Sequence, residues 1–396
     1  MRCRYSTCVL LLFALFSART VAGEEVRLVP SLTLQEEYND NIFFTATGEK
    51  RAFISSISPA VGLSGRSERL DARLTARLDG LLYEGNGSLN SIDQAYSGRL
   101  GYRLTEMVQV GMDGRFTRES RPDRSIESTG LVEAIKSSRQ FYGISGESVW
   151  SEKTMSSAAY SFERVDYDDR EDLDSQSHTA TLGLVHQLGF HLPGLNGRGN
   201  LGFNRNLFST TTVDSFSATI GASYALHELW SATADLGGRY TRSEVRVARL
   251  SPQGIENEEQ TTNDTGWLAN VALSYRGELS SGNLVFLRNV TVASGFGGAA
   301  ERTALVLGLN RRLSFELSAR ISAGYYLNQS EQGEFSNQAI DETTFRINPS
   351  LRYEFSPELA VEASYQYTRI SYSLSDREAG QNRFLIRCFA SLPLFE

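Results

Sequence analysis

Apolar and polar residues alternate along much of the chain with a period of two. Between residues 70 and 79, leucine or alanine stands at every even position, and a charged residue or threonine stands at every odd position. Successive side chains of a β-strand point to opposite faces, so this segment predicts a strand with one apolar and one charged face. In a soluble protein the apolar face packs on a core, whereas in an outer membrane it faces lipid and the charged face lines water.

The same alternation recurs along the chain, with the charged side chains on one parity of each strand. Clear further segments are 108–117, 230–240, 345–355 and 359–368. Short and long connections alternate between the candidate strands. We expect short turns at 65–68, 105–106, 151–153, 227–228, 278–282, 311–312 and 356–357, and longer polar loops at 39–51, 84–93, 118–136, 166–177, 246–264, 295–302, 328–342 and 373–381. The connection at 189–197 is longer than its place in this alternation predicts.

This arrangement predicts an all-β fold, a transmembrane antiparallel up-and-down β-barrel. It has about 18 strands, or 16 within the error of the strand boundaries, with short periplasmic turns and longer extracellular loops. A soluble β-sandwich shares the alternation. However, a sandwich of this size is usually shorter or split, and it does not need alternating long and short connections.

The amino terminus is typical of a secretory signal peptide. Arg2 and Arg4 precede an apolar run at 9–16, and small residues follow at 21–23. That apolar run is too short to span a bilayer, and no later segment holds 18 consecutive apolar residues. We therefore expect a signal peptide at 1–23 and a single barrel domain at 24–396. The mature chain then keeps only Cys388, which excludes an internal disulfide.

The composition restricts the function further. The chain carries 39 lysine and arginine residues against 47 acidic residues, a formal net charge of −8. This acidic balance argues against nucleic-acid binding, which needs a basic surface. The 17 tyrosines and 21 phenylalanines fit the aromatic girdles that barrels place at the two membrane interfaces.

The first predicted hairpin carries the most distinctive motif. Its turn reads Glu-Tyr-Asn-Asp-Asn-Ile-Phe at 37–43, and its second strand reads Phe-Ile-x-x-Ile-x-Pro-x-Val-x-Leu at 53–63. This stretch resembles a group of outer-membrane β-barrel porins found with exopolysaccharide and exosortase (PEP-CTERM) systems. The motif covers about the first 40 mature residues. The resemblance implies porin-like or polysaccharide-export work and no catalytic residues. The residues at 39–41 either shape the loop or bind a ligand, and their turn chemistry favours the first role.

The face of each predicted strand that carries the charged side chains supplies the candidate lumen residues. Arginine presents a rigid fork that suits carboxylate or phosphate, so an arginine-rich lumen favours anions or acidic sugars. The alternative is that these side chains pair across strands and stiffen the wall. The candidates are Asp71, Arg73, Arg77, Asp79, Arg99, Arg103, Asp113, Arg115, Asp235, Arg239, Arg276, Arg320, Arg346, Arg352, Glu354 and Glu362.

Sites for metals or catalysis are weak in this sequence. Asp166, Asp168, Asp169, Glu171, Asp172 and Asp174 crowd one loop but lack the glycine and closing glutamate of a calcium loop. His178 and His186 are eight residues apart, roughly 26 Å along a strand. No His or Cys cluster fits zinc, and no Ser/His/acid triad stands out. We expect no metal, no cofactor and no enzymatic activity.

The sequence therefore predicts an outer-membrane channel for hydrophilic solutes, and the resemblance implies a link to exopolysaccharide export. Its expected partners are outer-membrane lipid, the barrel assembly machinery, and polysaccharide with periplasmic export components. Nucleic acid is not expected. The alternative is a non-conducting structural or adhesive surface barrel that uses its long acidic loops.

Overall fold

We describe a computed structural model of the chain that covers residues 25–121, 136–168, 170–189, 192–251, 254–293 and 296–394, with the backbone alone at 247–251 and 254–258. Among these residues, the short 3₁₀ turns η1 (Gly87–Leu89) and η3 (Glu171–Leu173) accompany the strands. The strands are β1 (Glu25–Asn39), β2 (Ala52–Arg66), β3 (Leu70–Tyr83), β4 (Ser91–Arg103), β5 (Val108–Glu119), β6 (Ser137–Ser151), β7 (Thr154–Tyr167), β8 (Ser175–Gln187), β9 (Leu195–Phe208), β10 (Thr211–His227), β11 (Trp230–Ser251), β12 (Gly254–Arg276), β13 (Ser280–Ala293), β14 (Gly298–Arg312), β15 (Leu317–Ser330), β16 (Ile340–Ser356), β17 (Leu359–Tyr372) and β18 (Arg377–Ser391).

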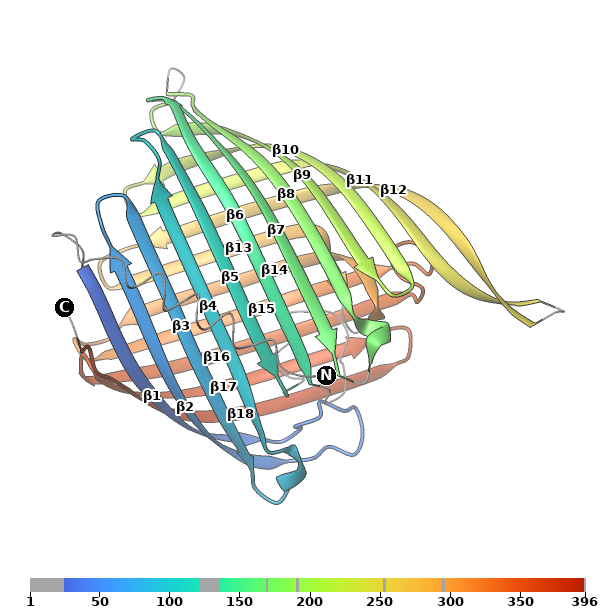
Figure 1. Ribbon diagram of the computed structural model, residues 1–396, viewed down its shortest axis with the longest axis horizontal. Helices are drawn as coiled ribbons and strands as arrows, with labels where there is room; N and C mark the ends of the chain where they lie inside the picture. The colour runs from blue at the N-terminus through green and yellow to red at the C-terminus, as the bar shows by residue number, and fades with distance from the viewer. Residues whose placement is uncertain are drawn as a thin grey trace, which may run out of the picture.

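The strands form one closed antiparallel barrel of 18 strands (Figure 1). Each strand pairs with its neighbours in sequence, and β1 closes the sheet by pairing with both β2 and β18. The predicted fold class and strand number are confirmed. In the described part of the chain, no helix is long and apolar enough to cross a membrane.

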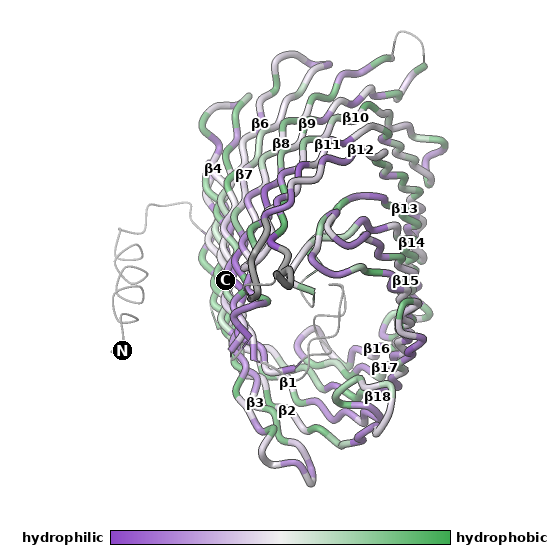
Figure 2. Tube along the Cα trace, turned by 90° about the vertical axis from the view of Figure 1, so that its right-hand side faces the viewer, coloured by the Kyte–Doolittle hydropathy of each residue, from purple (hydrophilic) through white to green (hydrophobic). Residues whose placement is uncertain are grey.

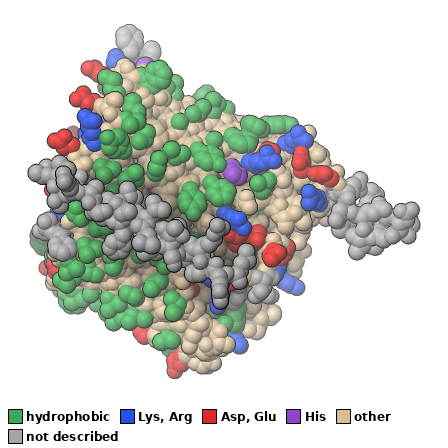
Figure 3. Space-filling view, in the orientation of Figure 1, with side chains coloured by type: hydrophobic (Ala, Val, Ile, Leu, Met, Phe, Trp, Pro, Cys, Tyr) green, Lys and Arg blue, Asp and Glu red, His purple; other side chains and the backbone are tan. Residues whose placement is uncertain are grey.

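The two faces of the wall differ in character. Arg121, just after β5, contacts Glu37 on β1, and Arg239 on β11 contacts Glu301 on β14. These strands are not neighbours, so the contacts cross the barrel interior. Large apolar side chains on the opposite, outer face stay exposed, and Figure 3 shows many of them on the visible face. Examples are Leu34, Phe53, Leu82, Ile92, Leu182, Leu201, Ile220, Leu236 and Leu351.

The β1–β18 closure is reinforced by the turn motif of the first hairpin. Asn41 donates through Nδ2 to the carbonyl oxygens of Thr45 and Gly380 at 2.8 and 3.0 Å, and its Oδ1 accepts from the Thr45 N–H. Asp40 accepts from the backbone and side-chain N–H groups of Asn382 at 2.7 and 2.6 Å. These bonds tie the β1–β2 loop to β18. The structure therefore gives the motif a loop-shaping role.

Both described ends of the chain lie at the same end of the barrel as the β2–β3, β4–β5 and β10–β11 turns, which we call the turn end; the opposite end is the loop end. Three sequence expectations for the connections were wrong. The loop expected at 246–264 is a β-ribbon, in which β11 and β12 pair up to Ser251 and Gly254. The turn expected at 311–312 lies at 313–316, after β14. The β9–β10 connection at the loop end was missed because it spans only residues 209–210.

The wall is split between β12 and β13 in its loop-end half. β13 pairs with β12 only from Ser281 to Arg288, although β12 begins at Gly254 and β13 continues to Ala293. β13 and β14 stay paired with each other throughout. Their loop-end segments, residues 288–293 and 298–303, are called the β13–β14 tip here. Figure 2 shows this region curving into the enclosed space.

Candidate functional site: the barrel interior

All sixteen residues predicted to line a lumen lie in strands. They alternate with exposed apolar side chains, so they share the inner face of the wall. Whether any of them contacts a solute stays a prediction. They lie on β3 (Asp71, Arg73, Arg77, Asp79), β4 (Arg99, Arg103), β5 (Asp113, Arg115), β11 (Asp235, Arg239), β12 (Arg276), β15 (Arg320), β16 (Arg346, Arg352, Glu354) and β17 (Glu362).

Several of these arginines pair with an acid two residues away on the same strand. On β3, Arg73 lies 3.4 Å from Asp71 and Arg77 lies 3.1 Å from Asp79. Such pairs neutralise charge and hold the side chains against the wall. The arginine side chains are about half exposed, so each pair contributes little to stability. Two further pairs of this kind are Arg115–Asp113 at 3.5 Å and Arg352–Glu354 at 3.0 Å.

Three other candidates have partners on different strands. Asp235 accepts from Arg198 on β9 at 3.1 Å, and Glu362 accepts from Arg387 on β18 at 3.2 Å. Arg346 donates to the Gln366 side chain at 2.8 Å. These contacts link neighbouring or nearby strands across the inner face.

An arginine patch at the turn end lacks such acids. Arg276 on β12 and Arg320 on β15 are exposed, and their side chains have no ion-pair or hydrogen-bond partner among the described residues. Arg276 pairs with Ser281, Ser281 with Asn310, and Asn310 with Arg320, so these residues form one row across β12–β15. The adjacent row toward the loop end contains Ser274, Asn283, Gly308 and Ser322. No carboxylate stands in either row.

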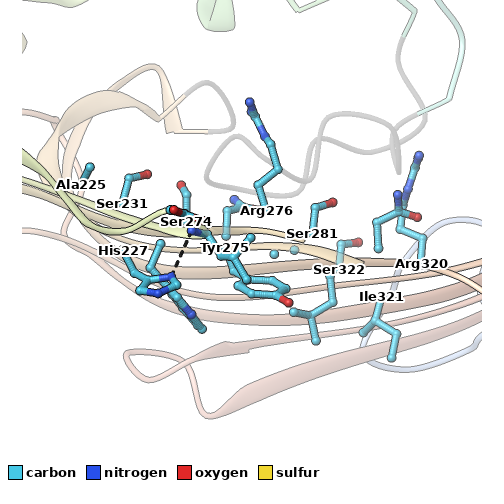
Figure 4. Close-up of a pocket in the computed structure, with 18 residues that line it drawn as sticks. Ala225, His227, Ser231, Ser274, Tyr275, Arg276, Ser281, Arg320, Ile321 and Ser322 are labelled. Carbon is cyan, nitrogen blue, oxygen red and sulfur yellow. Dashed lines mark hydrogen bonds between the residues drawn. The ribbon is translucent and has the colours of Figure 1, made fainter. Parts of the chain in front are cut away.

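A hollow of about 610 Å³ lies at the turn ends of β10–β15, and Figure 4 shows the residues that line it. Arg276 and Arg320 project to the same side of the wall, whereas Tyr275 and Ile321 project to the other side. On the far wall, Arg99 and Arg103 are also exposed and have no such partner in the part of the chain that the structure describes. Four arginines on the inner face at the turn end are therefore not paired with an acid among the described residues.

Toward the loop end, a buried ion cluster crosses the interior. Glu37 on β1 is fully buried between Arg121, from the β5–β6 connection, and Arg383 on β18. Arg121 donates to both carboxylate oxygens at 2.6 and 2.9 Å, and Arg383 donates to both at 2.8 and 3.0 Å. Two bidentate arginines thus share one carboxylate, a strong and directional arrangement. We call this the Glu37 cluster.

A second buried chain of charges, the Arg239 cluster, lies beside the split in the wall. The Arg239 guanidinium, 2% exposed, donates to Asp264 at 2.5 Å and to Glu301 at 2.8 Å. Glu301 also pairs with Arg288, whose guanidinium lies 4.6 Å from the ring centre of Trp267. The chain of four charged groups therefore joins β11 and β12 to the β13–β14 tip.

The connection between β15 and β16 packs against the Arg239 cluster. Phe335 is buried and lies with its ring centre 5.0 Å from the Arg239 guanidinium. Its carbonyl accepts from the Ala299 N–H at 2.9 Å. Burial raises the pKa of the neighbouring Glu334 carboxyl, and the Asp264 carboxylate raises it further. The interior is therefore narrowed here by a folded loop together with the tip.

The sequence pattern does not point to Glu37, Arg121, Arg383 and Glu301 as interior residues, nor to Arg288 at the split. Glu37 belongs to the turn motif and also has the inner parity of β1, which is the signal that could have found it. Arg121 follows β5 on the parity of Asp113 and Arg115, and that parity was the available signal.

The acidic loop and the histidines have ordinary local partners. In the acidic loop, Asp172 pairs with Arg170 at 2.9 Å, and this hydrogen bond lowers the pKa of the Asp172 carboxyl. Asp169 lies outside the described residues. His178 bonds to the Tyr160 hydroxyl at 2.8 Å and His186 to the Thr154 hydroxyl at 2.9 Å. Among the described residues, no three His, Cys, Asp or Glu side chains converge as a metal site would require.

Comparison with known proteins places the fold alone. No protein-family model and no curated protein matches the chain. The ferric-catecholate import receptor Fiu of E. coli K12, in its open form, is 8% identical with a TM-score of 0.50, over 93% of this chain and 82% of that one. OccAB4 of Acinetobacter baumannii is 10% identical with a TM-score of 0.49, over 93% and 98%. OccK2 (OpdF) of Pseudomonas aeruginosa, in complex with glucuronate, is 10% identical with a TM-score of 0.47, over 94% and 100%.

The Glu37 cluster predicts a large effect of a small substitution. Glu37→Gln removes the carboxylate shared by two buried guanidinium groups, so we expect the free energy of unfolding to fall by about 3 kcal/mol. Urea titration of the folded barrel in lipid vesicles measures this change. The matched control is Glu354→Gln, whose carboxylate is 52% exposed beside Arg352; we expect a loss below about 1 kcal/mol there. Equal losses in the two variants would contradict the buried-cluster assignment.

Proposed function

We propose that this protein is an outer-membrane channel for hydrophilic anionic solutes. The observation that carries the proposal is the turn-end arginine patch on the polar inner face of a closed barrel. An apolar outer face and a polar inner face suit a barrel with lipid outside and water inside. Barrels of 16–18 strands enclose an aqueous channel unless a loop or plug fills it.

The arginine patch supports a preference for anions. Unpaired guanidinium groups such as Arg276 and Arg320 attract carboxylates and phosphates and repel cations. The serine and asparagine side chains in the same two rows offer hydrogen bonds to hydroxyl groups. A solute that carries both carboxylates and hydroxyls, such as an acidic saccharide, matches this combination.

The finer proposal is a role in exopolysaccharide export. It is supported by the resemblance of the 37–43 motif and by the chemistry of the patch. In this role the barrel works with periplasmic export components, after the barrel assembly machinery has inserted it into outer-membrane lipid. Catalysis forms no part of the proposal, and neither does nucleic-acid binding.

A non-conducting surface barrel is the second candidate. The observation in its favour is that the Glu37 and Arg239 clusters place buried side chains inside the barrel at the loop end. Planar-bilayer recording with the purified protein separates the two candidates. Stepwise ion conductance supports the channel, whereas a barrel that never conducts supports the surface role.

The channel proposal predicts that the arginine patch sets ion selectivity. In Arg276→Glu/Arg320→Glu, two uncompensated positive charges become negative, so we expect the anion-to-cation permeability ratio to fall by about threefold or more. Reversal potentials across a KCl gradient measure this ratio. The control is Arg352→Gln/Glu354→Gln, which removes an ion pair without changing net charge, and we expect its ratio to stay near wild type. An unchanged ratio in the patch variant would remove the patch from the conducting path.

The membrane location predicts a depth-dependent cost for outer-face arginine. Leu201 in the middle of β9 and Leu279 in the β12–β13 turn are each 57% exposed. In lipid vesicles, we expect Leu201→Arg to lower the free energy of unfolding by about 2–4 kcal/mol and Leu279→Arg by at most about 1 kcal/mol. Chemical denaturation of the two variants gives the comparison. A cost for Leu201→Arg as small as that for Leu279→Arg would count against a lipid-facing band.

A further inference from the structure

The split between β12 and β13 is an interruption of a regular ladder. The last pair is Ala269 with Arg288, and both strands remain extended beyond it. Continued in the same register, the ladder would pair Leu268 with Asn289, Trp267 with Val290, Gly266 with Thr291, Thr265 with Val292 and Asp264 with Ala293. The backbone groups of β12 that point away from β11 over this stretch have no strand partner among the described residues.

The side chains of the tip follow the alternation of the outer wall. Val290 and Val292 lie at even positions of β13, as the exposed outer-face residue Leu284 does. Ala299 lies at an odd position of β14, as the exposed outer-face residue Leu305 does. By alternation, all three residues belong to the outer face. In the structure these three apolar residues instead pack inside the barrel, in a buried cluster with Phe208, Val213 and Phe335. The inward parity holds Asn289 and Thr291. This pattern therefore suits a continuous wall as well as the inward position.

The inward position depends on close packing and on the Arg239 cluster. A Cβ atom on Gly298 would lie 2.8 Å from the Phe335 carbonyl oxygen, so only glycine permits this approach. Ala293, Ala299 and Ala300 are fully buried, which their small side chains allow. Glu301 bridges Arg239 on the inner face and Arg288 at the split. Glu301 is thus the main ionic contact that holds the tip inward.

We propose that the β13–β14 tip is a two-position gate. In the inward position it narrows the interior beside β9–β11. In the second position, residues 289–293 pair with residues 264–268 of β12, the wall becomes continuous, and the interior widens. In this position Glu301 leaves Arg239 and comes to the outer face, where it stays close to Arg288, while Arg239 keeps Asp264 as its partner. The conductance readout for this gate rests on the proposed channel function.

A disulfide tests the second position directly. Thr265→Cys/Val292→Cys, made with Cys388→Ser, places two thiols opposite each other only when the ladder is complete, because a disulfide needs Cα atoms about 4.4–6.8 Å apart. We expect oxidation to form this bond, as detected by mass spectrometry, and to raise the single-channel conductance until a reductant is added. The control, Leu273→Cys/Leu284→Cys, joins two residues that are already paired. This pair lies on the same face as Thr265 and Val292, and at the same point of the alternating hydrogen-bond pattern. It should form its bond without a change in conductance.

The outcomes separate the gate from the channel. If the control bond forms and the Thr265–Val292 bond does not, the second position is overturned. If the Thr265–Val292 bond forms and conductance stays unchanged in a conducting protein, the gate is overturned. If no variant conducts at all, the channel function fails, and the accessibility measurement below still decides whether the tip opens the interior.

Thiol labelling provides that second readout, independent of conductance. Ser243 on the inner face of β11 is 1% exposed and pairs with Val213, which the tip covers. Glu301→Gln weakens the inward position by removing a buried charge. We therefore expect a Ser243→Cys reporter to react with a polar thiol reagent about tenfold faster in the Glu301→Gln background. Glu378→Gln, in the exposed pair with Arg369, is the control and should leave the rate unchanged. Equal rates in the two backgrounds would overturn the gate.

Discussion

Closure of the sheet is the constraint on which the rest of the structure depends. Because β1 pairs with both β2 and β18, no strand along the turn-end half of the wall has a free edge. A strand edge that is unpaired in lipid leaves backbone groups unsatisfied at high cost, so closure and an apolar outer face belong together. Closure also fixes register, since a slip of one residue would turn every apolar side chain inward. The bonds from Asp40 and Asn41 to β18 hold that register at the point where the ends of the sheet meet.

The split between β12 and β13 is the place where this constraint is relaxed, and its consequences are local. The tip turns its apolar side chains to the interior, where Phe208 and Val213 on the inner face provide an apolar surface for them. The same movement brings Glu301 to Arg239 and buries both charges. A buried pair of this kind adds little net stability but makes loss of either partner costly. The Arg239–Glu301 pair therefore favours the inward position of the tip but adds little to the stability of the barrel as a whole.

The local sequence pattern predicts the strands well, because the alternation of apolar and polar side chains depends only on residues that are neighbours in the sequence. Leu70 to Asp79 predicted a two-faced strand, and β3 has this form. The ribbon at 246–264 differs from the expected loop because its glutamates, threonines and asparagines show no apolar face, and an apolar face is the signal that predicts a strand. Contacts across the interior were beyond the sequence. Arg121 and Glu37 are 84 residues apart, and only the closed barrel brings β5 and β1 to face each other.

Some arginines of the inner face are paired with acids, and others have no acidic partner among the described residues. The two kinds contribute differently to the wall. On β3, Arg73 and Arg77 are occupied by Asp71 and Asp79, so this strand contributes a neutral, stiff surface. Arg276 and Arg320 face rows of serine and asparagine with no acid among them. A solute carboxylate gains more from an arginine that has no competing anion than from one that must first give up a partner. The count of lumen arginines is therefore a poor guide to selectivity, and the positions where acids are missing are a better one.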